Sequence, residues 1–565
     1  MKMLKKTMAL ALAVMMAMAM CVTAFADSTV KLTISDEKNH TYEVYQVLTG
    51  DVSNLTNGKG TLSNVKAGSS ANSTLTDANV SEVVALLSGT DSSVSEANLG
   101  NTVWSYVKGG AVYKTVNVTG GSATIDVAPG YYLLKDVTTG TTDSLSRYVV
   151  AVAGDTTVTP KTETPDIDKK IIDTDANEAL DDSKKTDTAA IGDTIEYEVT
   201  GKVPDMTGYT YYYYVLNDTL SKGLTLDENS FNVTVGGQTA VKGTNYNVYV
   251  TKNSDGTTSF KLAFADMKGT YSKDAAISIK YNATVNKDAE IGVNPNTNTA
   301  SLQYSNNPNT SERDDKTPDE PGVPSENPDS KNPTGNTENY ITKTYVTELK
   351  LTKTFDGAVK NGLIGAEFTL TGENLNTIEL TTASQFVEDT NGTYWKLTDG
   401  TYTTDDPATE GMDTSKYEST TTKYSVQTVV TEKTTSADNK KVVATIGADG
   451  TITFTGLNYG TYTLSETKTP TGYNTASDIN FAITRTLDAD SSTAKVGGTV
   501  TWADNSDDVT YNANTKTFSV TVDNVSGKLL PSTGGIGTTI FYVVGTLLVV
   551  GAAVLLISKR RMHNA

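Results

Sequence analysis

The chain is poor in the residues that build disulfides, metal sites and nucleophilic catalytic centres. It has one cysteine, Cys21, and two histidines in 565 residues. Cys21 lies in an apolar N-terminal stretch, and only His40 lies between that stretch and the apolar run near the C-terminus. The sequence therefore offers no Cys–His pair and no His/Cys zinc cluster, and it disfavours a Ser–His–Asp triad. We expect His40, in a polar turn beside Asn39, to be a solvated loop histidine.

Excess positive charge and long helical periodicity are also missing. The net charge is −20, so nucleic acid is not an expected partner. Val, Thr and Tyr, which favour strands, dominate the middle of the chain together with Gly, Asn and Asp, which favour turns. Many short alternating runs predict an all-β chain of tandem immunoglobulin-like sandwich domains that form an extended rod. Without disulfides, such a chain must find mechanical strength elsewhere.

The long apolar runs stand at the two ends. Residues 1–26 combine a lysine-containing start, an apolar stretch and Ala24-Phe25-Ala26, a pattern typical of a cleaved secretory signal peptide. Residues 538–558 carry no charge and precede Lys559-Arg560-Arg561, which predicts a transmembrane helix with a cytoplasmic basic tail. We therefore expect the rest of the chain to lie outside a membrane.

A short motif precedes the C-terminal run. Leu530, Pro531, Ser532, Thr533 and Gly534 resemble the cell-wall sorting signal of Gram-positive surface proteins. The resemblance implies that a sortase cuts between Thr533 and Gly534 and passes the Thr533 acyl group to an amine. An ordinary single-span anchor is the alternative.

Composition predicts the division of the remaining chain. We expect the N-terminal β domain to include a helix at 80–87 and a second short helix around Trp104. The third domain includes an insertion at about 405–441, expected to be a hairpin or a mobile loop. The expected segments are a signal peptide at 1–26, an N-terminal β domain at 27–160, a middle immunoglobulin-like domain at 161–310, a polar linker at 311–344, a third domain at 345–527 and the sorting segment at 528–565.

Three apolar stripes in the third domain end in polar residues. Alternation along strands aims Lys353, Glu466 and Asn524 inward. Burial favours the neutral amine of a lysine and the protonated acid of a glutamate. A neutral amine beside a carboxamide, with an acid to move protons, can form an amide bond and release ammonia. The alternative is a surface lysine, a surface glutamate and a turn asparagine.

Segments starting at Leu351, Leu363 and Tyr462 resemble the CnaB-type domains of Gram-positive pilins, and residues 462–473 match that family's "E-box". The resemblance implies a Lys353–Asn524 isopeptide bond with Glu466 as the catalytic acid.

A weaker version of the pattern occurs in the middle domain. Alternation aims Lys169, and not Lys170, into the core. Residues 215–224 and 304–308 resemble the middle domain of pilus backbone subunits, in which an Asp replaces the Glu. We predict a Lys169–Asn306 bond with Asp218 as the acid, although Asp218 could be a turn or cap residue. The remaining candidates for the bonded asparagine are Asn296, Asn298 and Asn307. For the first domain, which has only a partial E-box at 130–136, we predict no such bond.

The segment Val158-Thr159-Pro160-Lys161 resembles the end of the "pilin motif" of backbone pilins, but it lacks the Tyr, the Asn and the upstream Trp of that motif. The resemblance implies that Lys161 attacks the sortase acyl-enzyme and becomes linked to Thr533 of the next subunit. The alternative is an ordinary linker lysine.

The combined patterns resemble those of a Gram-positive backbone pilin. The resemblance implies a cell-wall-anchored structural protein, which promotes its own cross-links once and is not an enzyme. No cofactor is expected, and the sequence leaves open whether a metal ion binds a loop of acidic residues such as 173–187. Its expected partners are pilus-class and housekeeping sortases, copies of itself, peptidoglycan, and accessory or tip pilins. A monomeric wall-anchored adhesin that binds host matrix or glycan is the alternative, and a wall-bound hydrolase is disfavoured.

Overall fold

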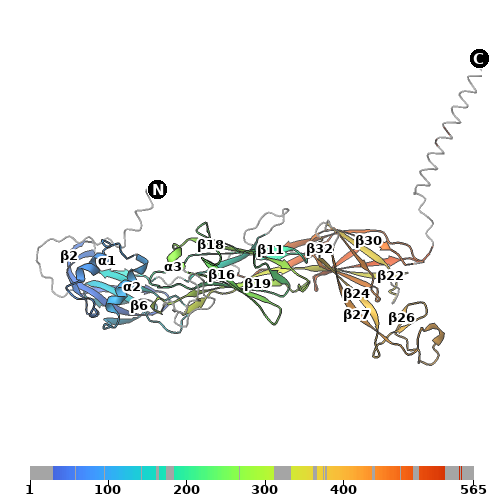
Figure 1. Cartoon of the computed structure of the whole chain (residues 1–565), viewed down its shortest axis with the longest axis horizontal. Helices are drawn as coiled ribbons and strands as arrows, with labels where there is room; N and C mark the ends of the chain where they lie inside the picture. The colour runs from blue at the N-terminus through green and yellow to red at the C-terminus, as the bar shows by residue number, and fades with distance from the viewer. Residues whose placement is uncertain are drawn as a thin grey trace, which may run out of the picture.

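The computed structural model describes residues 29–527 and the isolated residues Thr546 and Val549. Within 29–527 the exceptions are 57–58, 95, 142, 161–163, 173–183, 266, 311–332, 361–364, 373–374, 376–377, 435–439, 471 and 488–494. Three β domains follow one another along the long axis of the molecule, with the first domain at one end and the third at the other (Figure 1). The predicted all-β tandem architecture is confirmed.

The first domain packs two sheets around an apolar core. Strand β1 (Val30–Asp36) lies antiparallel to β5 and parallel to β8, and the second sheet has the order β3-β2-β6-β7 with β4 paired to β2. Two helices pack on the other face of the second sheet and form a separate apolar cluster with it: α1 (Val80–Leu87), which buries Val80, Val83 and Leu87, and α2 (Glu96–Val107). Both predicted helices are confirmed. The other strands are β2 (Thr41–Thr56), β3 (Lys59–Ala67), β4 (Lys114–Asn117), β5 (Gly121–Val127), β6 (Gly130–Asp136), β7 (Arg147–Val152) and β8 (Thr156–Val158).

The expectation of a solvated His40 is wrong. His40 is only 1% exposed, and its Nδ1 lies 2.9 Å from a carboxylate oxygen of Asp136 and 3.2 Å from one of Asp36. Asp136 ends β6 and Asp36 ends β1, so the two strand ends bring these carboxylates to the turn that carries His40. Contacts with carboxylates at the ends of two strands therefore accompany the burial of a histidine whose polar neighbours in sequence predicted exposure to solvent.

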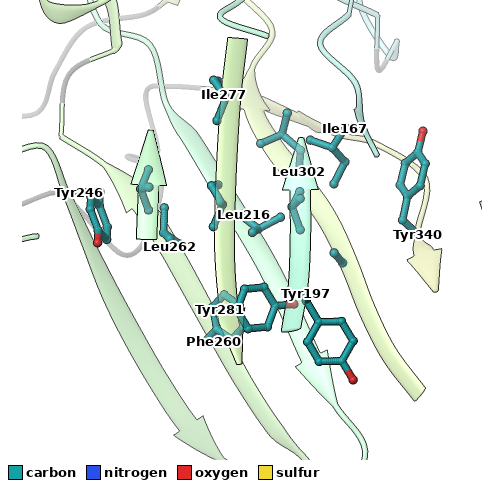
Figure 2. Close-up of a cluster of buried hydrophobic side chains, with 14 of the residues drawn as sticks. Ile167, Tyr197, Leu216, Tyr246, Phe260, Leu262, Ile277, Tyr281, Leu302 and Tyr340 are labelled. Atoms are coloured by element: carbon teal, nitrogen blue, oxygen red, sulfur yellow. The ribbon is translucent and has the colours of Figure 1, made fainter. Parts of the chain in front are cut away.

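The middle domain packs two larger sheets. Their strand orders are β10-β21-β19-β12-β17-β16 and β15-β14-β18-β11-β9, with β20 paired to β19 and β13 to β18. Tyrosines fill much of the core between them, and Figure 2 shows Tyr197, Tyr281 and Phe260 gathered in one part of it. The elements are β9 (Ile167–Ile172), β10 (Thr186–Thr188), β11 (Thr194–Lys202), β12 (Tyr214–Leu220), β13 (Leu224–Leu226), β14 (Asn232–Val235), β15 (Gln238–Thr239), β16 (Tyr246–Lys252), β17 (Thr258–Phe264), α3 (Met267–Thr270), β18 (Ala276–Val285), β19 (Asn296–Ser305) and the 3-10 turn η1 (Pro308–Thr310).

The last part of the expected 311–344 linker belongs to the middle domain instead. Strand β20 (Thr334–Asn336) pairs with β19, and β21 (Tyr340–Tyr345) lies between β10 and β19 as an inner strand of the sheet. Tyr340 and Thr342 are buried there. The linker prediction failed here because the short alternating strand at Tyr340–Tyr345 directly follows a polar stretch and was assigned to the linker with it.

The third domain is a sandwich of two sheets with the orders β27-β24-β29-β22-β34-β33 and β28-β23-β30-β31-β32. A long hairpin of β24 and β27 projects from this domain and carries a small sheet of β25 and β26 (Figure 1). The insertion expected at 405–441 contains only the second strand of this hairpin, because the first strand lies at 378–388. The elements are β22 (Thr347–Phe355), β23 (Glu367–Gly372), β24 (Ile378–Glu388), β25 (Trp395–Lys396), β26 (Tyr402–Thr403), η2 (Thr414–Lys416), β27 (Tyr424–Thr434), β28 (Lys441–Thr445), β29 (Thr451–Leu457), β30 (Gly460–Lys468), β31 (Ile479–Leu487), β32 (Val500–Asp504), β33 (Val509–Asn512) and β34 (Thr517–Asn524).

Polar contacts join the middle and third domains. The guanidinium of Arg485 lies 2.6 Å from the carboxylate of Asp187, and the amide of Ile191 donates to the carbonyl of Gly456 over 3.0 Å. Gly456 has φ +93°, and a Cβ there would meet the side chain of Ile191 at 2.6 Å, so the close approach requires glycine. This junction fixes the direction in which the third domain continues the rod.

The described residues include no helix long and apolar enough to cross a membrane. The predicted span at 538–558 lies outside the described residues, apart from Thr546 and Val549. The predicted signal peptide at 1–26 also lies outside them.

Candidate cross-linking sites

The first and last strands of the third domain lie side by side. Strands β22 and β34 run parallel, with Lys353 opposite Val522 and Phe355 opposite Asn524. The Lys353 side chain has no exposed surface, and its Nζ donates to the carbonyl oxygens of Thr354 at 2.7 Å and Val522 at 3.0 Å. The parallel pairing therefore places Lys353 two residue pairs from Asn524 along the adjacent strands.

The acid comes from the opposite sheet. Glu466, on β30, accepts a 2.8 Å hydrogen bond from Nδ2 of Asn524 on Oε2, and the amide of Ala476 donates to the same oxygen at 2.8 Å. Glu466 Oε1 and Asn524 Oδ1 are both buried without a hydrogen-bond partner in the described part of the chain. The structure thus brings together the three side chains that the sequence predicts, with the acid against the leaving nitrogen of the carboxamide.

Burial lowers the pKa of Lys353 to about 8, and the nearby Glu466 and Asp523 partly offset that effect. The shift arises because an ammonium group loses its hydration in the core. A fully hydrated lysine at neutral pH is almost entirely protonated and is not a nucleophile. Burial in the third-domain core therefore increases the fraction of Lys353 that is present as the neutral, nucleophilic amine at neutral pH.

This pKa sets a pH dependence for closing the third-domain bond. In chain purified unfolded and then refolded by dilution, the rate of ammonia loss should rise about tenfold per pH unit below pH 7 and level off above about pH 8. The sign follows because raising the pH towards the lowered pKa increases the neutral amine. Mass spectrometry of the peptides that contain Lys353 and Asn524 at timed intervals measures the rate. A rate that is constant from pH 5 to pH 8 would contradict the assignment.

The middle domain has a second buried lysine beside an acid. Lys169, on β9, has no exposed surface, and its Nζ contacts Oδ2 of Asp218 at 2.6 Å and the hydroxyl of Tyr281 at 2.8 Å. Burial lowers the pKa of Lys169 to about 8, an effect that Asp218 partly offsets, and burial raises the pKa of Asp218. Both shifts favour transfer of the lysine proton to the carboxylate. Asp218 is therefore a buried strand residue paired with Lys169, and not a turn or cap residue.

The prediction that Asn306 is the bonded asparagine is wrong. Strand β12 pairs with β19 so that Asp218 lies opposite Ala300, which puts Asn306 beyond the end of the strand pair, away from Lys169. The carbonyl of Asn306 instead accepts a 2.7 Å hydrogen bond from the amide of Leu145 in the first domain. Asn306 thus contributes to the joint between the first and middle domains.

Asn298 lies at the site instead. It is completely buried on β19, next to Ala300 on the same face, and its Nδ2 donates to the Tyr281 hydroxyl at 3.0 Å. Asn296 bonds the main chain of Glu290, and Asn307 accepts from the amide of Asn309. Of the four asparagines left open by the sequence, Asn298 is the one the structure brings to Lys169 and Asp218.

Sequence reasoning missed Tyr281. It follows Ile277 and Ile279 on the buried face of β18, so its spacing indicates only an aromatic core residue. Its hydroxyl reaches the site because β18 lies beside β11 in the sheet, with Tyr281 opposite Tyr197. No local signal in the sequence distinguishes it from the other tyrosines of this core.

The residues predicted to join subunits are not placed. Lys161 and the sorting motif Leu530, Pro531, Ser532, Thr533 and Gly534 lie outside the described residues. Strand β8, which precedes Lys161, ends at Val158 and lies parallel to β1. Among the described residues, no group of three or more His, Cys, Asp or Glu side chains is placed to hold a metal ion.

Three family models match the chain in series. They are the Gram-positive pilin backbone subunit 2, Cna-B-like domain at residues 191–308, a prealbumin-like fold domain at 412–496, and the LPXTG cell wall anchor motif at 523–564. The first match includes Asp218 and Asn298, the second includes Glu466, and the third includes the predicted sorting motif. The chain therefore contains domains that match the Gram-positive pilin backbone and prealbumin-like families, and it carries a cell-wall anchor motif that places it on the cell surface.

The chain also resembles individual proteins. The chain is 28% identical over 460 residues to the trypsin-resistant surface T6 protein of Streptococcus pyogenes serotype M6, which covers 77% of this chain and 75% of the relative. Among solved structures, the T6 backbone pilin of serotype M6 S. pyogenes aligns over 90% of this chain and 100% of its own, with 15% identity and a TM-score of 0.47. The full-length major pilin SpaD of Corynebacterium diphtheriae aligns over 90% and 99%, with 14% identity and a TM-score of 0.40.

Proposed function

We propose that this chain is the backbone subunit of a sortase-polymerised pilus, joined head to tail through Thr533 of one subunit and Lys161 of the next. Internal Lys353–Asn524 and Lys169–Asn298 amide bonds stiffen each subunit. Each internal site acts once, on its own chain, so the protein is not a turnover enzyme. The observation that carries the proposal is the pair of buried lysine–acid–asparagine sites in consecutive domains of a chain that ends in a cell-wall anchor motif.

The positions of the two internal bonds suit tension along a fibre. In the third domain, the bond would tie β22 to β34, which are its first and last strands. In the middle domain, it would tie β9 in one sheet to β19 in the other. Force that enters at Lys161 and leaves at Thr533 would pass through both cross-linked domains and bypass the first domain. The first domain would then need no such bond.

The partners follow from the same chemistry. A pilus-class sortase would form the Thr533–Lys161 links, and a housekeeping sortase would transfer the finished polymer to peptidoglycan. Accessory or tip pilins would be attached at the tip of the fibre or at side positions along it. Each of these steps uses the same reaction, in which the Thr533 acyl group is passed to an amine.

Co-expression with a pilus-class sortase tests this function. The wild-type chain should form a ladder that resists boiling in SDS, and Lys161→Ala and Thr533→Ala should each abolish it. Lys202→Ala, at an exposed lysine of the middle domain, is the matched control and should retain the ladder. A ladder from Lys161→Ala would contradict the proposed linkage. A single wall-linked band from the wild-type chain would instead support the monomeric adhesin.

A further inference from the structure

Among the described residues, the middle-domain site contains a fourth polar side chain that has no counterpart in the third-domain site. We infer that Tyr281 is a catalytic residue for the Lys169–Asn298 bond, since its hydroxyl connects the acid to the carboxamide and carries the proton that the departing ammonia needs. This inference rests on the proposed cross-link in the middle domain. It adds a residue and a proton path to that site.

The Tyr281 hydroxyl contacts all three reacting side chains. It donates to Oδ2 of Asp218 at 2.6 Å, and it accepts from Nζ of Lys169 at 2.8 Å and from Nδ2 of Asn298 at 3.0 Å. A phenol hydroxyl has one proton to donate and two lone pairs to accept with, so these three bonds use its full capacity. All four side chains are at most 2% exposed. The hydroxyl is therefore the centre of the site.

The difference in length between the two acids explains why a tyrosine is needed here. In the third domain, Glu466 reaches Nδ2 of Asn524 directly, over 2.8 Å. Asp218 is one methylene shorter, and within the described residues it shares no hydrogen bond with Asn298. Its Oδ2 bonds only Lys169 and Tyr281, and its Oδ1 has no partner. The Tyr281 hydroxyl spans the gap that the shorter acid leaves.

The reaction balances with these four groups. The Lys169 ammonium gives one proton to Asp218, and the neutral amine attacks Cγ of Asn298, which forms the new C–N bond. As the Cγ–Nδ2 bond breaks, the attacking nitrogen loses its second proton and Nδ2 gains one, so that ammonia leaves. Protonated Asp218 can donate to the Tyr281 oxygen while the tyrosine donates its own proton to Nδ2. The attacking nitrogen's proton restores the acid.

The side chains around Tyr281 exclude water and keep its hydroxyl protonated, so that it can pass on a proton. Its ring lies 5.4 Å from that of Tyr197 and 5.0 Å from that of Phe260, and Figure 2 shows these three side chains together. Burial, with the adjacent Asp218 carboxylate, raises the pKa of Tyr281 well above its ordinary value. The hydroxyl therefore stays protonated and passes a proton on without becoming a phenolate. A dry, low-dielectric site also strengthens each of these hydrogen bonds.

The test compares rates of bond formation in full-length chain that is isolated unfolded from inclusion bodies, before either bond has formed, and is then refolded from denaturant. Peptide mass spectrometry follows the ammonia lost between Lys169 and Asn298, while the third-domain bond in the same molecules serves as an internal reference. Tyr281→Phe keeps the ring and should slow the middle-domain bond at least about tenfold. Tyr214→Phe is the matched control and should have no effect. Tyr214 is equally buried on β12, and its hydroxyl has no hydrogen-bond partner among the described residues.

A second substitution separates catalysis from packing. Asp218→Glu restores the length of the third-domain acid, so in the Tyr281→Phe background it should recover most of the lost rate. A Tyr281→Phe chain that closes the bond at the wild-type rate would overturn the inference, as would equal slowing by Tyr214→Phe. Failure of Asp218→Glu to recover the rate would overturn the account based on acid length. A wild-type chain that never loses this ammonia would instead refute the middle-domain cross-link itself.

Discussion

Replacing Lys353 by methionine is expected to abolish ammonia loss in the third domain and to lower that domain's free energy of unfolding by about 5 kcal/mol. The size follows from loop-closure entropy, because a bond from 353 to 524 closes nearly the whole domain into one loop. Methionine fills a similar volume without a charge, so little packing is lost. Calorimetry of the full chain, with intact mass on the same sample, measures both effects.

Two further variants control this experiment. Lys350→Met changes an exposed lysine on the same strand and should alter neither the mass deficit nor the melting temperature. Glu466→Gln keeps the lysine and the asparagine but removes the acid, so it should leave the bond unmade and a charged lysine buried. If Lys353→Met melts at the wild-type temperature, the third domain has no such cross-link.

Replacing Asp218 by asparagine should have a comparable effect in the middle domain. The change removes the carboxylate that lies 2.6 Å from the fully buried Lys169 ammonium. An uncompensated buried charge costs about 3–5 kcal/mol, and the loss of the covalent bond adds to that cost. Limited trypsin digestion should then cut the middle domain first, while the third domain stays resistant.

Asp205→Asn is the matched control for this prediction. Asp205 pairs with Lys273 at 3.1 Å near the surface of the same domain, and exposed pairs contribute about 1 kcal/mol or less. Equal trypsin sensitivity of Asp205→Asn and Asp218→Asn would show that the buried site has no special part in stability. Retention of the middle-domain ammonia loss in Asp218→Asn would show that another group is the acid.

Alternation along strands predicted much of the fold and most of the candidate site. It placed Lys353, Glu466 and Asn524 on inward faces because each ends an apolar stripe, and the structure brings the three together. The same rule failed for Asn306, because every second residue of β19 faces inward and only the register with β12 decides which one meets Lys169. Register depends on pairing between strands far apart in sequence, which local alternation does not contain.

Two other differences have the same origin. His40 is buried because Asp36 and Asp136 reach it from the ends of two strands, one of them nearly a hundred residues away. Tyr281 reaches the middle-domain site because β18 is placed there by its neighbouring strand β11. In both cases the local sequence correctly indicates the secondary structure around the residue. The contacts that the residue makes depend on the tertiary fold.

The linkage between subunits is tested most directly by tandem mass spectrometry of a dimer made by a pilus-class sortase from the wild-type chain. The account predicts one branched peptide, in which the carboxyl group of Thr533 is joined to the side-chain amine of Lys161. A dimer joined at any other lysine would contradict the account.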